Sequence, residues 1–254
     1  MKKFMSLLLT GSLLMATMVG CSSNSDTGTA SGKTDTLIMG TNAQFPPFEY
    51  YEGNRITGFD VELAALIAGE LGMNLRIEDM EFNTLVGAVQ NGMIDVVVAG
   101  MTATDDRKTQ IDFTDGYFYS KQMVIVPTNS DITDIDDLEG KRIGVQLGTT
   151  GDIFASEFIE DASIIKFDKG AMAVADLKNG TVDAVIIDEQ PATSFVSGQN
   201  DIKLLEVPFA EEEYAIGLKK GNTELLNDIN NALAKLKSNG AYDTLYTKYF
   251  SDAD

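Results

Sequence analysis

A twelve-residue pattern occurs twice in the sequence, at Gln90–Met101 and at Lys178–Glu189. Each copy has the end of a helix, an Asn-Gly pair, an Asp and then an apolar strand. Glycine just after the last helical residue typically ends a helix, and a continuous apolar run is typical of a strand buried on both faces. The matched positions are Asn91 and Asn179, Gly92 and Gly180, and Asp95 and Asp183. Although Asn-Gly is a common turn between helix and strand, two copies in register predict two similar α/β lobes.

Each copy also places an unusual residue where its strand ends, Gly100 in the first and Asp188 in the second. After Gly100 the chain continues to Arg107, a cation in the first turn of a predicted helix, where the helix dipole disfavours it. The candidate N-caps of this helix are Thr102 and Thr104. Local pairing with Asp105 or Asp106 would explain Arg107, and the alternative is a small anionic ligand at the strand end. Ligands of open α/β sheets bind at the carboxyl ends of strands. Facing lobes would therefore bring Arg107 and Asp188 together, as complements to the carboxylate and ammonium of a free amino acid.

The N-terminal residues predict export and lipid attachment. Two lysines precede the apolar stretch 4–19, which is too short and wrongly flanked for a transmembrane helix. Small residues before Cys21 resemble the cleavage box of bacterial lipoproteins, with Met18 where that box usually carries Leu. Because Cys21 is the only cysteine, no intramolecular disulfide is possible. We expect a signal peptide at 1–20, a lipid on Cys21 and a flexible tether at 21–35; a plain disordered terminus would predict the same tether.

Composition argues against several classes of function. Cleavage leaves 254 − 20 = 234 residues, which is enough core for two lobes, and loss of the two lysines takes the formal charge from −20 to −22. Such an acidic chain disfavours binding to nucleic acid or directly to an anionic membrane. The chain has no histidine and no cluster of metal-ligand residues, which disfavours an enzyme and a metal cofactor. We expect a monomer without a cofactor.

Alternating strands and helices predict an α/β fold with mixed sheets. We expect the chain to cross between lobes near 117–121 and to return through a strand at 214–218. The predicted division is 36–119 with 214–254 for the first lobe and 120–213 for the second. The turn at 147–152 offers hydroxyls and backbone N–H groups at a helix N-terminus, but it lacks the Gly-Lys-Ser/Thr of a P-loop, so we expect no nucleotide.

Motifs spread over residues 35–251 resemble the polar amino-acid family of periplasmic-type solute-binding proteins, which serve ABC importers. These motifs are Gly40–Phe48, Gly58–Asp60, Ala99–Arg107, Asp112–Thr114, and Tyr242 with Tyr249-Phe250. The resemblance implies a two-lobed periplasmic-binding-protein-like fold of type II, with two hinge crossings and lobes that close on the ligand. It also implies an extracytoplasmic, lipid-anchored protein that passes a free amino acid to the membrane subunits of a permease. An enzyme such as a dehydratase on the same scaffold, and an extracellular sensor, are the alternative functions.

The resemblance further implies which residues recognise the common part of an amino acid. Arg107 would grip the α-carboxylate with help from Thr102, Thr150 and the backbone around Gly100, and Asp188 would hold the α-ammonium. The full predicted set of ligand-binding residues is Asn42, Phe45, Glu49, Phe82, Ala99, Gly100, Met101, Thr102, Arg107, Gln146, Thr149, Thr150 and Asp188.

The far end of the ligand would meet a second group of side chains. Phe45 and Phe82 fall where family aromatics sandwich the ligand side chain, and a guanidinium stacks on such faces better than a compact ammonium does. Asn42, Glu49 and Gln146 lie where they can reach its tip. Asn42 stands where lysine- and ornithine-binding members often have Asp, and the segment 145–152 resembles arginine-binding members. We expect arginine first, lysine second and, because the two amides suit a neutral amide equally well, glutamine as the main alternative.

Overall fold

The computed structural model describes residues 35–205 and 210–251, and every structural statement below concerns these residues. The predicted signal peptide, Cys21 and nearly all of the predicted tether lie outside them. The helices are α1 (Phe59–Glu70), η1 (Phe82–Thr84), α2 (Leu85–Gln90), α3 (Asp105–Gln110), η2 (Ile135–Leu138), α4 (Thr150–Phe158), α5 (Gly170–Lys178), α6 (Glu189–Val196), α7 (Thr223–Ser238) and α8 (Ala241–Phe250). The strands are β1 (Thr36–Thr41), β2 (Gln44–Phe45), β3 (Glu49–Glu52), β4 (Arg55–Thr57), β5 (Asn74–Asp79), β6 (Val96–Val97), β7 (Asp112–Pro127), β8 (Arg142–Gln146), β9 (Ser163–Phe167), β10 (Ala184–Asp188), β11 (Ile202–Leu204) and β12 (Ala210–Leu218).

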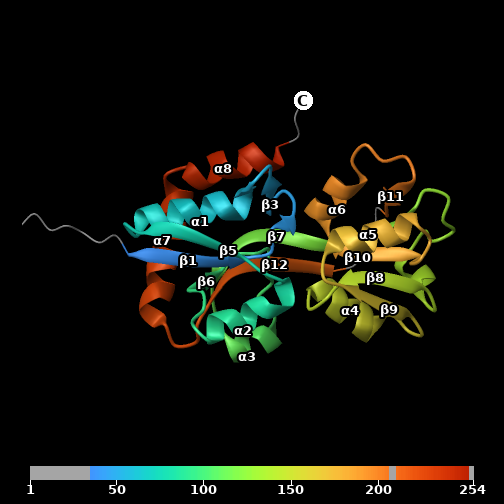
Figure 1. Cartoon of the computed structure of the whole chain (residues 1–254), viewed down its shortest axis with the longest axis horizontal. Coiled ribbons are helices and arrows are strands. Elements are labelled where there is room, and N and C mark those ends of the chain that lie inside the picture. The colour runs from blue at the N-terminus through green and yellow to red at the C-terminus, as the bar shows by residue number, and fades with distance from the viewer. Residues whose placement is uncertain (1–34, 206–209, 252–254) are drawn as a thin grey trace, which may run out of the picture. The chain divides into compact units, whose positions relative to one another are not determined.

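The described strands form one mixed sheet of nine and a smaller sheet of three, β2-β3-β4. The large sheet has the order β5-β1-β6-β12-β7-β10-β8-β9, with β11 also paired to β7. β5-β1-β6 and β10-β8-β9 are parallel sets, and the antiparallel pair β12-β7 lies between them. Each parallel set is the centre of one lobe, so the predicted two-lobed α/β fold is confirmed (Figure 1).

β7 and β12 carry the chain between the lobes. β7 runs for 16 residues, pairing first with β12 and then with β10 and β11. The return crossing begins at Ala210, where it pairs with Gln122, and not at Tyr214 as the sequence predicted. Three consecutive glutamates, which are disfavoured in strands, led to that error. The predicted lobe boundaries fall inside these two strands, and they stay a prediction.

The repeated pattern has the same structural role in both lobes. Asn91 and Asn179 are helix C-caps, and the glycine after each has a positive φ, of 70° and 72°. The Asp95 carboxylate accepts the backbone N–H of Ile38 at 2.8 Å, and the Asp183 carboxylate accepts that of Arg142 at 2.9 Å. In each lobe the aspartate therefore fastens the start of one central strand to its parallel neighbour, which confirms the predicted similarity of the lobes.

Helices cover both faces of the large sheet. Figure 1 shows α1 and α8 on one face of the first lobe and α2 and α3 on the other, while α4 lies opposite α5 and α6 in the second lobe. Aromatic rings fill the core where β7 meets α8, with Phe118 at 4.7 Å from Phe250 and 4.9 Å from Phe48 between ring centroids. This packing fixes the crossing strands against the first lobe.

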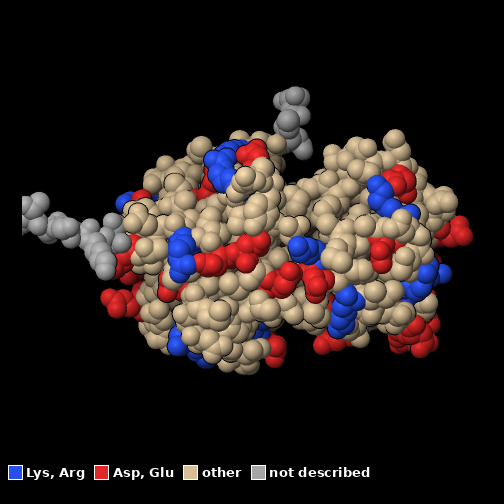
Figure 2. Space-filling model, viewed as in Figure 1, with Lys and Arg blue, Asp and Glu red and all other residues tan. Residues whose placement is uncertain are grey.

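Acidic side chains run across the middle of the face in Figure 2, as expected for a formal charge of −20.

Candidate functional site

A cavity lies at the junction of the two lobes, with about 310 Å³ of space not filled by protein atoms, counted together with open solvent at its mouth. Its wall is formed by Asn42, Phe45, Glu49, Phe82, Ala99, Gly100, Thr102, Arg107, Gln146, Thr149, Thr150 and Asp188. These are twelve of the thirteen residues predicted from the sequence. The exception is Met101, whose side chain is fully buried in the core with Ile94 and Ile111.

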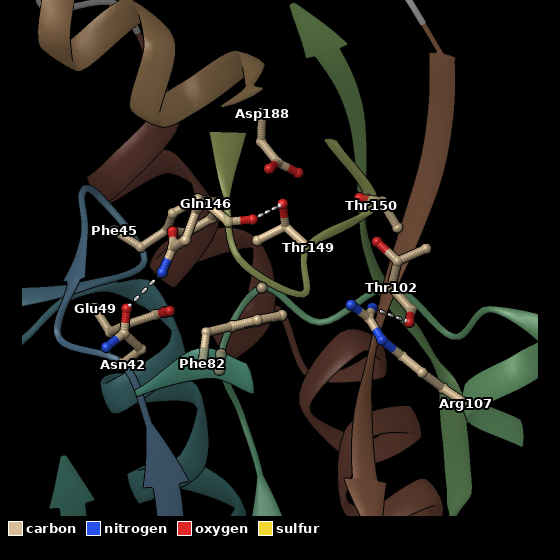
Figure 3. Close-up of a pocket in the computed structure, with 12 residues that line it drawn as sticks. Asn42, Phe45, Glu49, Phe82, Thr102, Arg107, Gln146, Thr149, Thr150 and Asp188 are labelled. Carbon is tan, nitrogen blue, oxygen red and sulfur yellow. Dashed lines mark hydrogen bonds between the residues drawn. The ribbon is translucent and has the colours of Figure 1, made fainter. Parts of the chain in front are cut away.

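Strand ends bring these residues together. Asn42 follows β1 and Gly100 follows β6 in the first lobe, while Gln146 ends β8 and Asp188 ends β10 in the second. Because β1 and β6 are parallel, as are β8 and β10, the carboxyl ends within each lobe open on the same edge of the sheet. Figure 3 shows Asn42 and Glu49 at one side of the cavity and Arg107 at the other.

Arg107 is held in the first turn of α3 with its guanidinium directed to the lobe junction. Thr104 is the N-cap, and its hydroxyl accepts the Arg107 backbone N–H at 3.2 Å; Thr102, the other predicted N-cap, does not cap the helix. The guanidinium donates to the backbone carbonyl oxygen of Thr102 at 2.7 Å (Figure 3). It also donates to the backbone carbonyl oxygen of Gly148, in the other lobe, at 2.8 Å. Arg107 thus links the two lobes directly.

No carboxylate in the described part of the chain forms an ion pair with Arg107. The pairing considered from the sequence is not formed, because Asp105 contacts Lys108 and Asp106 accepts from Gln110. Arg107 is only 6% exposed, and this burial lowers its pKa. A buried cation without an anionic partner is costly. The side chain is therefore suited to receive an anionic group in the cavity.

Gly100 allows the chain to turn closely past the cavity. Its φ is +52°, and an added Cβ would lie 2.8 Å from the ring of Phe45, so only glycine fits here. Its backbone N–H donates to the Asp60 carboxylate at 2.8 Å, and the Tyr117 hydroxyl donates to the same oxygen at 2.7 Å. Burial raises the pKa of Asp60 to about 6, although these two donors oppose the rise.

Glu49 is a buried acid in the cavity wall. Neither of its side-chain oxygens meets a nitrogen or hydroxyl donor among the residues that the structure describes. It is 1% exposed and faces the carboxyl of Asp60, and two carboxyl groups can hydrogen-bond only by sharing a proton. Burial, and then the neighbouring Asp60, raise the pKa of Glu49 well above its usual range. A cation in the cavity would stabilise the ionised form of Glu49.

The amides predicted to reach the ligand bond to each other across the lobes. Gln146 donates its Nε2 to Asn42 Oδ1 at 3.0 Å (Figure 3) and to the carbonyl oxygen of Asp168 at 3.1 Å. Asn42 in turn donates to the carbonyl oxygen of Met80 at 2.9 Å. Both amide NH₂ groups thus have protein acceptors, while a second lone pair on Asn42 Oδ1 is left for another donor.

The two predicted aromatic residues also have protein partners. The guanidinium carbon of Arg107 lies 5.4 Å from the ring centroid of Phe82, within cation–π range. Phe45 stacks on Phe48 at 5.7 Å between ring centroids. Phe82 therefore orients the buried cation as well as lining the cavity.

Asp188 ends β10 and is 4% exposed, with one carboxylate oxygen accepting from the Tyr214 hydroxyl. Burial, and then the nearby Glu212 carboxylate, raise the pKa of Asp188 well above its usual range. Sequence reasoning missed Glu212, which is 8% exposed and contacts Thr102 and Thr150 behind the cavity wall. The period of two along a strand could have found it, because Tyr214 and Glu212 share a face of β12.

Other kinds of site find no support within residues 35–205 and 210–251. These residues contain no group of three or more His, Cys, Asp or Glu side chains placed to hold a metal ion. None of their helices combines the length and apolar character that a membrane crossing requires.

Two α/β lobes joined by two crossing strands around a polar cavity define the class of two-lobed, periplasmic-binding-protein-like solute receptors. The chain belongs to the bacterial extracellular solute-binding proteins, family 3, which residues 37–252 match. This confirms the family and fold that the sequence motifs predicted.

Three relatives illustrate the similarity. The arginine-binding extracellular protein ArtP of Bacillus subtilis (strain 168) is 36% identical over 99% of this chain and 99% of its own. An ancestral arginine-binding protein bound to arginine has a TM-score of 0.81 at 41% identity, covering 85% of this chain and 98% of its own. An ancestral arginine-binding protein was also solved bound to glutamine, with a TM-score of 0.79, 41% identity and coverage of 85% and 97%.

Proposed function

We propose that this protein captures free arginine outside the cytoplasm and delivers it to the membrane subunits of an ABC importer. The observation that carries the proposal is that one cavity wall contains both a buried cation without an ion-pair partner, Arg107, and two buried acids, Glu49 and Asp188. Arg107 would bind the α-carboxylate and Asp188 the α-ammonium. The names of ArtP and of the ancestral arginine-binding protein support the same ligand.

The balance of charge around the cavity favours a cationic ligand. Glu49, Asp60, Asp188 and Glu212 are all buried, and no basic side chain in the described part of the chain forms an ion pair with any of them. Arg107 alone cannot balance these acids. Arginine and lysine carry a net positive charge and would therefore be held more firmly than a neutral amino acid.

Glu49 is the proposed partner of the ligand's distal cation. Its two oxygens match the planar, bidentate donor geometry of a guanidinium, which an ammonium lacks. We therefore propose that the protein binds arginine more tightly than lysine. Glutamine is the main alternative, because Asn42 Oδ1 can accept from a neutral amide and one ancestral arginine-binding protein was solved with glutamine.

The site favours binding over catalysis. The described residues of the cavity wall include no cysteine or histidine, and its acids Glu49 and Asp188 would contact opposite ends of the proposed ligand. We therefore propose that the protein is a receptor without a cofactor, and we retain the proposal that it is a monomer. A dehydratase or a sensor role would need chemistry or a partner beyond this cavity.

Calorimetric titration with arginine, lysine, glutamine and histidine tests the ligand. We expect arginine to bind most tightly, and Glu49→Gln to weaken arginine by about 10- to 100-fold, as for loss of a charged hydrogen bond, while changing glutamine little. Glu52→Gln is the matched control, because Glu52 lies on the same strand with its side chain 67% exposed. Glutamine binding ten-fold tighter than arginine would overturn the proposed ligand.

Closure of the lobes on the ligand is part of the same proposal. Contacts already join the lobes directly, from Arg107 to Gly148 and from Gln146 to Asn42. A bound amino acid would add further bridges, because Arg107 and Asp188 lie in different lobes. Small-angle scattering should give a smaller radius of gyration with saturating arginine, and an unchanged scattering profile would count against closure.

Lipid attachment at Cys21 would keep the receptor at the membrane. The motivation is the small-residue box before Cys21 and the polar tether after it. Cys21→Ala should release the protein into the medium or leave its precursor uncut, as judged by membrane fractionation and the mass of the mature chain. Ser22→Ala, next to it, should change neither. Full membrane retention of Cys21→Ala at the wild-type mature mass would refute the anchor.

A further inference from the structure

Glu212 joins the hydroxyl groups of both lobes behind the cavity. Its Oε2 accepts from the Thr102 hydroxyl of the first lobe at 2.6 Å and from the Thr150 hydroxyl of the second at 2.6 Å. Its Oε1 accepts from Gln122 Nε2 at 2.5 Å. The alternation of β12 turns Glu212 inward while Glu211 and Glu213 on either side are exposed. Both threonines line the cavity, but Glu212 is not part of its wall.

These bonds determine in which direction each threonine hydroxyl donates its proton and in which direction it presents its lone pairs. A hydroxyl has one proton to donate and two lone pairs to accept with. The hydroxyls of Thr102 and Thr150 both donate their proton to the Glu212 carboxylate. Thr150 also accepts from Gln122 at 3.1 Å, which leaves it one lone pair. Toward the cavity the two hydroxyls are therefore acceptors, which suit an ammonium and cannot donate to a carboxylate.

We propose that Glu212 is a positioning residue for the α-ammonium of the ligand, acting through the Thr102 and Thr150 hydroxyls, whose lone pairs it turns toward the cavity. The inference rests on the proposed capture of an amino acid. It revises the role that the resemblance implied for the two threonines. The α-carboxylate would then be held by Arg107 and backbone N–H groups, and the ammonium by Asp188 with the threonine oxygens.

The surroundings of Glu212 agree with a cation subsite. The charged and titratable groups that interact with it are Asp188, Arg107 and Tyr214, from three different elements. Asp188 faces Glu212, and after burial the charge of Glu212 is the next largest cause of the raised pKa of Asp188. A ligand ammonium near the two acids would offset this repulsion.

The test compares an amino acid with the analogue that lacks only its α-ammonium. L-arginine and 5-guanidinopentanoate are titrated into the wild type, Glu212→Gln and the matched control Glu211→Gln, whose side chain faces solvent on the same strand. Glu212→Gln should weaken L-arginine by about 10- to 100-fold and change 5-guanidinopentanoate by less than about twofold. Glu211→Gln should change neither. Equal losses for both compounds, or no loss, would overturn the positioning role, because a purely structural residue does not distinguish the two.

A second variant guards against misfolding of the first. Thr102→Val removes one hydroxyl and keeps Glu212, and it should give the same selective loss for L-arginine. The double variant should lose no more than the larger single one, because both act through one contact; additive losses would argue against the relay.

Failure of the ligand assignment gives a different result. If the wild type prefers L-glutamine, the proposed ligand is wrong and the same comparison is made with glutaramate, its analogue without the α-ammonium. A wild type that binds neither amino acid overturns the proposed function and, with it, any ammonium subsite.

Discussion

Replacing Arg107 by alanine is expected to lower the affinity for the amino acid by about two to three and a half decades. Removing one partner of a buried charge pair costs roughly 3–5 kcal/mol, and each decade corresponds to about 1.4 kcal/mol. The loss should be large because Arg107 is 6% exposed, where water screens its interaction with a ligand carboxylate little. Calorimetry with the wild type and the variant measures it.

Thermal unfolding of the ligand-free variant separates this loss from misfolding. The alanine removes two hydrogen bonds to carbonyl oxygens but also relieves a buried cation, so the melting temperature should barely change. Arg76→Ala is the matched control, because Arg76 is an exposed cation on β5 of the same lobe. Wild-type affinity for every amino acid in Arg107→Ala would show that Arg107 is not the carboxylate anchor.

Asp188→Asn is expected to lower the affinity by a similar two to three and a half decades, because Asp188 is the one acid that the described residues of the second lobe contribute to the cavity wall. The asparagine keeps an acceptor for the Tyr214 hydroxyl, so the change removes charge with little change of shape. The control is Asp201→Asn, whose side chain is 56% exposed beside Lys178. Affinity within threefold of the wild type would contradict the ammonium role.

Because the pKa of Asp188 is raised, Asp188→Asn should change how the free energy of unfolding depends on pH. A carboxyl whose pKa is higher in the folded than in the unfolded protein stabilises the fold below the unfolded value, and that stabilisation is lost as the pH rises through the folded value. The free energy of unfolding of Asp188→Asn should therefore fall less than that of the wild type as the pH rises. Glu49 and Asp60 leave part of the slope in place, because burial raises the pKa of both. A slope equal to that of the wild type would show that Asp188 does not titrate in this way.

The repeated pattern carried most of what the sequence could predict of the fold. Asn-Gly after a helix and Asp before a strand have local consequences, the helix cap and the bond to the neighbouring strand, and both lobes show them. The cavity wall was predictable for a related reason, since strand ends in parallel sheets must share one edge. That twelve of the thirteen predicted residues line one cavity follows from these two rules together with the family motifs.

The misses share a different cause, because each depends on contacts between segments far apart in the chain. The side chain of Met101 packs into the core, while its neighbour Gly100 lines the cavity. The sequence alone does not show which of these two residues belongs to the cavity wall. The predicted return strand begins at Tyr214 and so leaves out Glu212, because consecutive glutamates are disfavoured in strands. The burial of Glu212 depends on Thr102 and Thr150, which lie 110 and 62 positions away in the sequence.

The position of β12 in the middle of the sheet also sets an order of events during synthesis. Gly217 pairs with Val97, 217 − 97 = 120 positions earlier, so β6 has no neighbour on that side until nearly all of the chain has been made. An unpaired strand edge is a template for wrong pairing, and contacts between distant segments form slowly. The lobe that begins the polypeptide is therefore the last to be completed.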